Sequence, residues 1–258
     1  MNKITKKLLV GVAATGACFT MFSGMASAEE EKPTANLTVG ALSQYIWRGF
    51  ELSKDSIVIQ PSITVAYKGF SANLWGNLDT DPYMDDQDNW NETDMTLAYA
   101  WDIDPVAFSV GYIYYALEAD DTQEFYVSAG LKSILKPTLT IYRDVDSYEG
   151  WYVTLGISHS IPVHNDITLD MGAQVSYLSS DSGDNAITDE DGESYDDFHD
   201  GVLSVGLTIP LCSYATINPK LMYTFALSDD AEYVMRGASM NGDDDDFFYG
   251  GVSVTMTF

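Results

Sequence analysis

The chain has little positive charge and almost no cysteine. It carries 12 lysine and arginine residues against 39 acidic ones, a net charge of −27 at pH 7. A chain this acidic repels nucleic acid and anionic membrane surfaces, so nucleic acid is excluded as a partner. The cysteines are Cys18 and Cys212. Because Cys18 lies in a segment that we expect to be removed, no intrachain disulfide stabilises the mature fold.

Long hydrophobic runs are absent except near the N-terminus. Residues 1–28 combine three early lysines, an apolar stretch from Leu8 to Phe22 and the small-residue motif Ala26-Ser27-Ala28. This is the layout of a secretory signal peptide, and the alternative, an anchoring helix, needs roughly 20 apolar residues. We predict cleavage after Ala28 and a single domain over residues 29–258. Cleavage removes three lysines and no acid, so the net charge moves from −27 to −30.

Helical periodicity is also absent after residue 28, and alternation at period 2 replaces it. About twelve segments alternate apolar and polar residues, an even number, as in single-chain bacterial barrels. The first has Leu37, Val39, Ala41, Tyr45 and Trp47 on one face, and the last has Phe248, Val252, Val254, Met256 and Phe258. This pattern predicts antiparallel strands with one apolar face.

The connections between these segments alternate in length. Short ones such as Lys68-Gly69 are followed by long acidic ones at 79–90, 179–197 and 228–246. A secreted β-sandwich also alternates, but here the apolar faces are almost free of charge and aromatic residues cluster at strand ends, as a bilayer requires. These aromatic residues are Trp47, Tyr67, Trp101, Tyr114, Trp151 and Tyr177.

We therefore predict an all-β protein, a transmembrane antiparallel up-and-down β-barrel in the bacterial outer membrane. Short periplasmic turns and long acidic extracellular loops connect the strands, and outer-membrane lipid and lipopolysaccharide surround them. The last strand must pair with the first, which places Phe258 in the barrel wall. A terminal aromatic residue after alternating apolar positions also resembles the signal read by the barrel assembly machinery, so we expect Phe258 to act in assembly.

Residues 43–79 resemble the N-terminal signature of the TorF family of porins. The matching positions are Ser43, Tyr45, Arg48-Gly49, Gln60, Gly69-Phe70 and Trp75-Gly76. The chain departs from the family at Gln44, where an aspartate is usual, and at Val58-Ile59, where small residues are usual. The resemblance implies a barrel of the porin type and does not imply a particular solute.

Strand parity predicts which side chains line the lumen. The expected pore-lining residues are Arg48, Gln60, Asn73, Trp75, Asp94, Tyr115, Tyr126, Tyr152, Asp170, Lys220 and Tyr249. The large aromatic residues among them belong to the extracellular half, where their rings would narrow a polar passage. A one-residue bulge would reverse any of these assignments.

Two histidines raise the possibility of an enzyme at the barrel rim. His199 lies among Asp196, Asp197 and Asp200, an arrangement that can activate water. We favour a solvated loop histidine among acids. His159, in the sequence Ser-His-Ser, faintly resembles the outer-membrane phospholipase A motif, but we expect it at the periplasmic end. We predict no enzyme activity, no catalytic residue and no cofactor.

The acidic loops lack the ligand spacing of an EF-hand, so we predict no specific metal site. Their carboxylates would still attract divalent cations loosely. The leading function is a porin-like barrel that allows passive diffusion of small cationic or neutral solutes. The alternative is a non-conducting structural or adhesive barrel whose acidic loops bind cations or a surface partner, and a rim hydrolase is a distant third.

Overall fold

The computed structural model describes residues 32–83, 88–164 and 166–258. The predicted signal peptide therefore lies outside the described residues. The elements are β1 (Thr34–Leu42), β2 (Ile46–Trp47), β3 (Phe50–Glu51), β4 (Val58–Tyr67), β5 (Phe70–Asp79), β6 (Trp90–Ile103), β7 (Val106–Leu117), β8 (Thr122–Leu131), β9 (Thr138–Asp144), β10 (Gly150–His164), β11 (Ile167–Ser180), β12 (Asp196–Cys212), β13 (Ala215–Ala226), α2 (Asp229–Ala238) and β14 (Asp246–Thr257).

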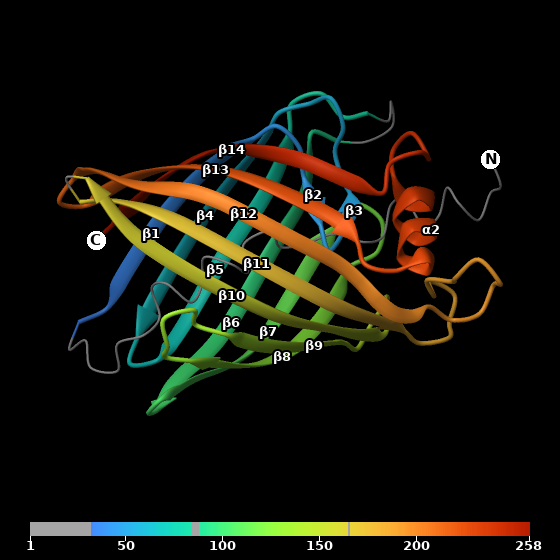
Figure 1. Ribbon diagram of the computed structural model, residues 1–258, viewed down its shortest axis with the longest axis horizontal. Coiled ribbons are helices and arrows are strands. Elements are labelled where there is room, and N and C mark those ends of the chain that lie inside the picture. Colours follow the sequence, from blue (N-terminus) through green and yellow to red (C-terminus); the bar gives the residue numbers. More distant parts are fainter. Residues whose placement is uncertain (1–31, 84–87, 165) are drawn as a thin grey trace.

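Twelve of these strands form a closed antiparallel barrel, in which each strand pairs with its neighbours along the chain (Figure 1). The barrel closes between β1 and β14, with Asn36 opposite Thr257 and Leu42 opposite Gly251. The Phe258 N–H donates to the Ala35 carbonyl at 2.8 Å. The predicted architecture and the place of Phe258 in the wall are confirmed. Strands β2 and β3 pair only with each other and stand apart from the barrel sheet.

The outer face of the barrel is an apolar belt. Every barrel strand exposes at least one large apolar side chain, for example Leu37, Ile63, Leu74, Met95, Val110, Phe125, Leu139, Leu155, Met171, Leu203, Leu221 and Val252. A continuous belt of this kind is unstable in water and matches hydrocarbon, and closure leaves no strand edge unpaired in lipid. The protein is thus a multi-pass β-barrel of the bacterial outer membrane. Within the described ranges, no helix combines the length and apolarity needed to cross a bilayer.

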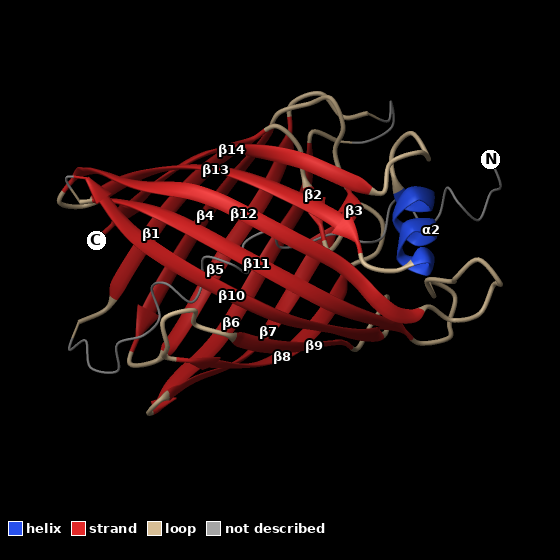
Figure 2. Cartoon of the chain, in the orientation of Figure 1, coloured by secondary structure: helices blue, strands red, loops and turns tan. Residues whose placement is uncertain are grey.

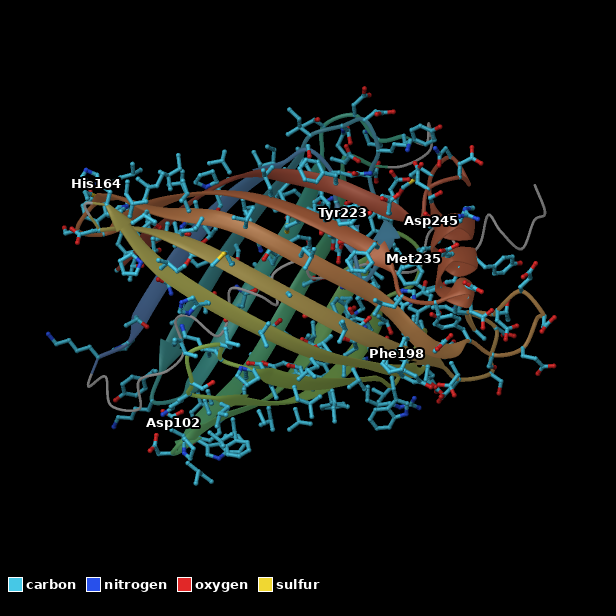
Figure 3. The ribbon with its side chains drawn as sticks, in the orientation of Figure 1. Asp102, His164, Phe198, Tyr223, Met235 and Asp245 are labelled. Atoms are coloured by element: carbon cyan, nitrogen blue, oxygen red, sulfur yellow. The ribbon has the colours of Figure 1, made fainter. Side chains whose placement is uncertain are left out.

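Connections at the two ends of the barrel differ in length, as predicted. At the short-turn end, Lys68 and Gly69 join β4 to β5 with φ of 50° and 83°, the positive values that a two-residue hairpin turn needs. A Cβ on Gly69 would lie 2.5 Å from the Ala100 carbonyl oxygen, so glycine is required there. In Figure 3, His164 lies near this end, and Phe198, Met235 and Asp245 lie near the opposite, long-loop end. Long loops of outer-membrane barrels are extracellular.

One helix interrupts the β architecture in the part of the chain that the structure describes, contrary to the prediction that no segment after the signal is helical. Helix α2 lies across the long-loop end (Figure 2). The Ser228 side chain caps it by accepting a hydrogen bond from the Ala231 N–H at 3.1 Å. Its first turn is acidic, which suits the helix dipole, and its apolar face is buried. The buried residues are Ala231, Val234, Met235 and Ala238.

Candidate functional site

The connection between β1 and β4 folds into the barrel as a second, smaller hairpin. We call residues 45–53 the inner hairpin. Tyr45, Ile46, Trp47 and Phe50 are all at most 7% exposed. The prediction that Tyr45 and Trp47 continue the lipid-facing side of the first strand is wrong. Strand β1 ends at Leu42, and the chain then turns inward. A barrel of twelve strands is wider than the eight-stranded size that wall side chains can fill, so the inner hairpin occupies space that would otherwise hold water.

The turn of the inner hairpin is Arg48-Gly49, with φ of 48° and 79°. Because Trp47 pairs with Phe50, this is a two-residue turn, and positive φ at both positions marks it as type I′. Arginine is strained there by about 1–2 kcal/mol. Gly49 lies against the helix: a Cβ on it would approach the Met235 sulfur to 3.0 Å. The tip therefore lies directly beneath α2.

The Arg48 side chain anchors the tip to the barrel wall. Its guanidinium donates two hydrogen bonds of 2.7 Å to the two carboxylate oxygens of Glu124. It also lies 4.4 Å from the centroid of the Trp47 ring, 4.9 Å from Tyr142 and 4.3 Å from Tyr152. The Tyr115 hydroxyl donates to Glu124 at 2.6 Å. This is a buried ion pair with bidentate geometry, surrounded by ring faces.

His199 holds the backbone of the same turn. Its Nε2 lies 2.8 Å from the Arg48 carbonyl oxygen and its Nδ1 lies 3.0 Å from the Tyr195 hydroxyl. The ring packs on Phe50 at 5.1 Å between centroids. Because the side chain is 0% exposed, the expectation of a solvated histidine at the rim is wrong. Asp196 is exposed, but Asp200 is buried and accepts from Tyr152 at 2.8 Å, so the acids flanking His199 are not all solvated.

The base of the inner hairpin is tied to the β13–β14 loop. The buried Glu51 carboxylate accepts from the Met240 N–H at 2.7 Å and from the Gln44 amide. Lys54 bridges Glu51 and Asp244 at 3.4 and 2.7 Å. Burial raises the pKa of the Glu51 carboxyl, although Met240 and Lys54 oppose the shift, and the hydrogen bond from Lys54 lowers the pKa of Asp244. Two segments distant in sequence thus close the long-loop end together.

An acidic pair, Glu92 and Asp94, lies on the inner face of β6 beside Tyr45 of the inner hairpin. The Tyr45 hydroxyl donates to Glu92 at 3.1 Å, and the Tyr45 ring packs on Trp75 at 5.7 Å. Asp94 stands opposite Trp75 on one side and Tyr115 on the other. Within the described chain, Glu92 Oε1 and both Asp94 oxygens accept no hydrogen bond. Glu92 and Asp94 are 2% and 1% exposed.

The predicted pore-lining residues belong to two groups. Trp75, Asp94, Tyr115, Tyr152 and Tyr249 are buried around the inner hairpin, and Arg48 forms part of its turn. The others contact wall residues: Gln60 donates to Asn77, Asn73 to Ser62 and Thr64, Tyr126 packs on Tyr142, and Asp170 accepts from Ser160 and Thr208. Lys220 interacts electrostatically with Asp170. Sequence reasoning placed Arg48 on a wall strand, whereas the structure places it on the inner hairpin.

Toward the short-turn end the inner face carries small polar side chains. They hydrogen-bond across strands, with Thr38 and Thr255 at 3.0 Å, Ser128 and Thr140 at 2.8 Å, and Asn218 and Thr208 at 3.0 Å. Side chains of this size line a wide barrel without filling it. The barrel therefore has two zones, one lined by small polar groups and one packed with aromatic and acidic groups around the inner hairpin.

A pocket remains beside the inner hairpin in the packed zone, and we call it the mouth pocket. Its lining includes Trp47, Arg48, Phe50, Tyr115, Glu124, Asp144, Tyr148, Tyr152 and Ile187. Tyr148 and Ile187 come from the β9–β10 and β11–β12 loops, so the pocket opens among the long loops. Among the described residues, no three acidic, histidine or cysteine side chains are placed to hold a metal ion.

Solved structures share this architecture. A KdgM porin superposes with a TM-score of 0.54 at 12% identity, covering 86% of this chain and 99% of its own. A NanC porin superposes with a TM-score of 0.55 at 11% identity, covering 86% and 98%.

The fold is that of a porin.

At these identities the likeness establishes the porin fold and nothing finer. No family model matches the chain, and no curated protein matches it in sequence. The TorF resemblance of residues 43–79 therefore stays a prediction. A KdgM porin in complex with disordered oligogalacturonate also has the porin fold, with a TM-score of 0.51 at 12% identity, covering 87% of this chain and 99% of its own.

Proposed function

We propose that the protein is a porin-like channel of the outer membrane, through which small solutes diffuse passively along a passage narrowed by the inner hairpin. The supporting observation is the contrast between the two zones. Toward the short-turn end the inner face carries small hydroxyl and amide side chains, and in the long-loop half a folded element lies inside the barrel. A twelve-stranded barrel is wider than side chains of that size can fill, which supports a water-filled passage. A polar inner face suits contact with water and solutes, whereas a barrel with a purely structural role could fill its interior with packed side chains.

The passage in this proposal runs through the mouth pocket beside Arg48. Its walls there are the rings of Trp47, Tyr115 and Tyr152 and the carboxylates of Glu124 and Asp144. Arg48 is neutralised by Glu124, so the remaining charge along the route is negative. The finer proposal is therefore a preference for cationic or neutral solutes, strongest at low salt because screening at 0.15 M acts over roughly 8 Å.

We also propose that the protein is related to the TorF-family porins, that the barrel assembly machinery inserts it and that its loops contact lipopolysaccharide. The acidic loops would meet lipopolysaccharide phosphates through divalent cations. Such bridges suit carboxylates on loops at the long-loop end, which the outer-membrane orientation places outside the cell.

Single-channel recording of the refolded protein in planar bilayers tests the channel. We expect measurable conductance that favours cations, and a larger conductance when residues 45–53 are replaced by a short glycine-serine link. Tyr152→Ala should also raise conductance, while Tyr233→Ala, an exposed ring on α2, should not. Anion preference in the unmodified protein would overturn the selectivity.

A second candidate is a non-conducting barrel whose acidic loops form the working surface. The tight anchoring of the inner hairpin favours it. Arg48 ties the tip to Glu124, His199 holds the backbone of the turn, and Glu51 ties the base to the β13–β14 loop. Absence of conductance in the unmodified protein together with conductance after removal of residues 45–53 would support this candidate. Absence in both would show that the small-residue zone is not an open lumen.

A further inference from the structure

No positively charged side chain among the described residues acts on the acidic pair Glu92–Asp94. The two carboxyl groups adjoin each other, and Glu124, the other carboxylate that acts on Asp94, has both of its oxygens occupied by Arg48. Three of the four carboxylate oxygens of the pair accept no hydrogen bond. Buried carboxylates without donors are costly, so a site of this kind calls for a bound cation or for protons.

The lumen itself shows which cation such surroundings accept. Elsewhere in the same packed zone, the Arg48 guanidinium is bound by one carboxylate and three aromatic rings, those of Trp47, Tyr142 and Tyr152. The acidic pair has similar surroundings, with two carboxylates instead of one next to the rings of Tyr45, Trp75 and Tyr115. What differs is that no side chain of the described chain supplies the cation.

We propose that Glu92 and Asp94 form a binding site for a small monovalent organic cation with an ammonium or guanidinium head, a solute that the channel carries. The proposal rests on the proposed porin function for the route by which the solute reaches the pair. Tyr45 covers the site from the inner hairpin, held there by its hydrogen bond to Glu92. A guanidinium or ammonium donor would satisfy the three free oxygens, and its flat or alkyl face would lie on Trp75.

Hard divalent cations fit the site less well. Calcium needs six to eight oxygen ligands and magnesium demands near-ideal octahedral geometry. The acidic pair offers two carboxylates, and the surrounding groups are indole and phenol rings. The described residues also contain no set of three metal-binding side chains at this position. Ring faces favour a weakly hydrated organic cation over a small, strongly hydrated metal.

Isothermal titration of the folded protein in detergent with methylguanidinium chloride at low salt tests the site. We expect saturable binding that weakens at least tenfold in Asp94→Asn and in Glu92→Gln, and several-fold in Trp75→Leu, which leaves both carboxylates in place. Asp170→Asn is the matched control, because that inner-face carboxylate already accepts from Ser160 and Thr208. Heat-modifiable migration on gels confirms that each variant is folded.

Two results would overturn the site. The first is absence of binding to the folded unmodified protein. In that case, an infrared carbonyl band of a protonated acid that Asp94→Asn removes would show that the pair holds a shared proton only. The second is binding that survives both Asp94→Asn and Glu92→Gln but falls when Asp243 is neutralised, which would place the cation on the loops. Binding without single-channel conductance would support the site and overturn the channel.

Discussion

Removing the Arg48 guanidinium should release the inner hairpin from the wall while leaving the barrel closed. Arg48→Met keeps a long side chain and the same strained backbone, but loses the bidentate contact with Glu124. The barrel hydrogen bonds do not pass through the inner hairpin, because β2 and β3 pair only with each other. The variant should therefore destabilise the closed position of the inner hairpin and leave the pairing of the barrel strands unchanged.

The size of the effect follows from burial. The Arg48 and Glu124 side chains are 9% and 3% exposed. Removing one partner of such a buried pair costs about 3–5 kcal/mol, because it strands the other charge. Each ring contact adds roughly 0.5–2 kcal/mol. A loss of about 4 kcal/mol shifts the closure equilibrium by roughly a thousandfold, since about 1.4 kcal/mol corresponds to a factor of ten.

Conductance and tryptophan fluorescence together measure this shift. Trp47 moves from a buried site to water when the hairpin is released, so its emission should move to longer wavelength as conductance rises. Arg48→Lys is the graded control, because lysine keeps the charge and loses the bidentate fork. In the double variant Arg48→Met with Glu124→Gln, the loss of hairpin closure should be smaller than the sum of the two single losses, since no unpaired charge remains in the double variant.

The reasoning fails if Arg48→Met and Glu124→Gln each leave Trp47 emission and conductance unchanged. It also fails if the double variant loses as much as the two singles combined, because then the two side chains do not act on each other. Loss of the heat-modifiable barrel in Arg48→Met would show that the inner hairpin supports the wall.

Three further results are expected. Glu51→Gln should flatten the pH dependence of stability. The pKa of Glu51 is raised in the folded protein, so the folded carboxyl binds the proton more tightly than the unfolded one, whose pKa is near 4.3. The free energy of unfolding of the unmodified protein should therefore fall as pH rises from about 4.3 through the folded pKa. Equal slopes of the urea midpoint against pH in both proteins would contradict this. Phe258→Asp should lower the yield of heat-modifiable barrel in cells, because an acidic residue replaces an exposed apolar one in the wall, and normal yield would remove its assembly role. A tag at Asp184 should be detected on intact cells and one beside Lys68 only after the membrane is opened; the reverse would invert the barrel.

The barrel was predictable because lipid imposes a strict alternation on its outer face. Residues such as Leu37, Val39, Leu203 and Val205 are apolar at every second position, and all four are exposed in the structure. Strand count and the short and long connections follow from the same pattern and from turn residues such as Lys68-Gly69. Strand ends were less predictable, since the inner wall tolerates both polar and aromatic residues.

The inner hairpin was not predictable from alternation. Tyr45 and Trp47 fall on the same parity as Leu37 to Ala41, interrupted only at Ser43, so the pattern extends the first strand beyond its end. The signal against this reading was local: Arg48-Gly49 between aromatic residues is a two-residue turn candidate, and a turn there leaves no room for a wall strand to continue. Helix α2 also had a sequence signal, with Ser228 before three acidic residues and apolar residues at Ala231, Val234 and Ala238.

His199 shows why the remaining contacts of the site could not be predicted from sequence patterns and depend on tertiary structure. Its partner is the carbonyl of Arg48, a group that every residue has and that no motif encodes. The residues that carry the TorF resemblance are more telling, because the structure gathers several of them at the inner hairpin. Tyr45 holds Glu92, Arg48-Gly49 makes the turn and Trp75 packs on Tyr45. In this chain these residues together form a first loop that folds inward and is fixed to the barrel wall.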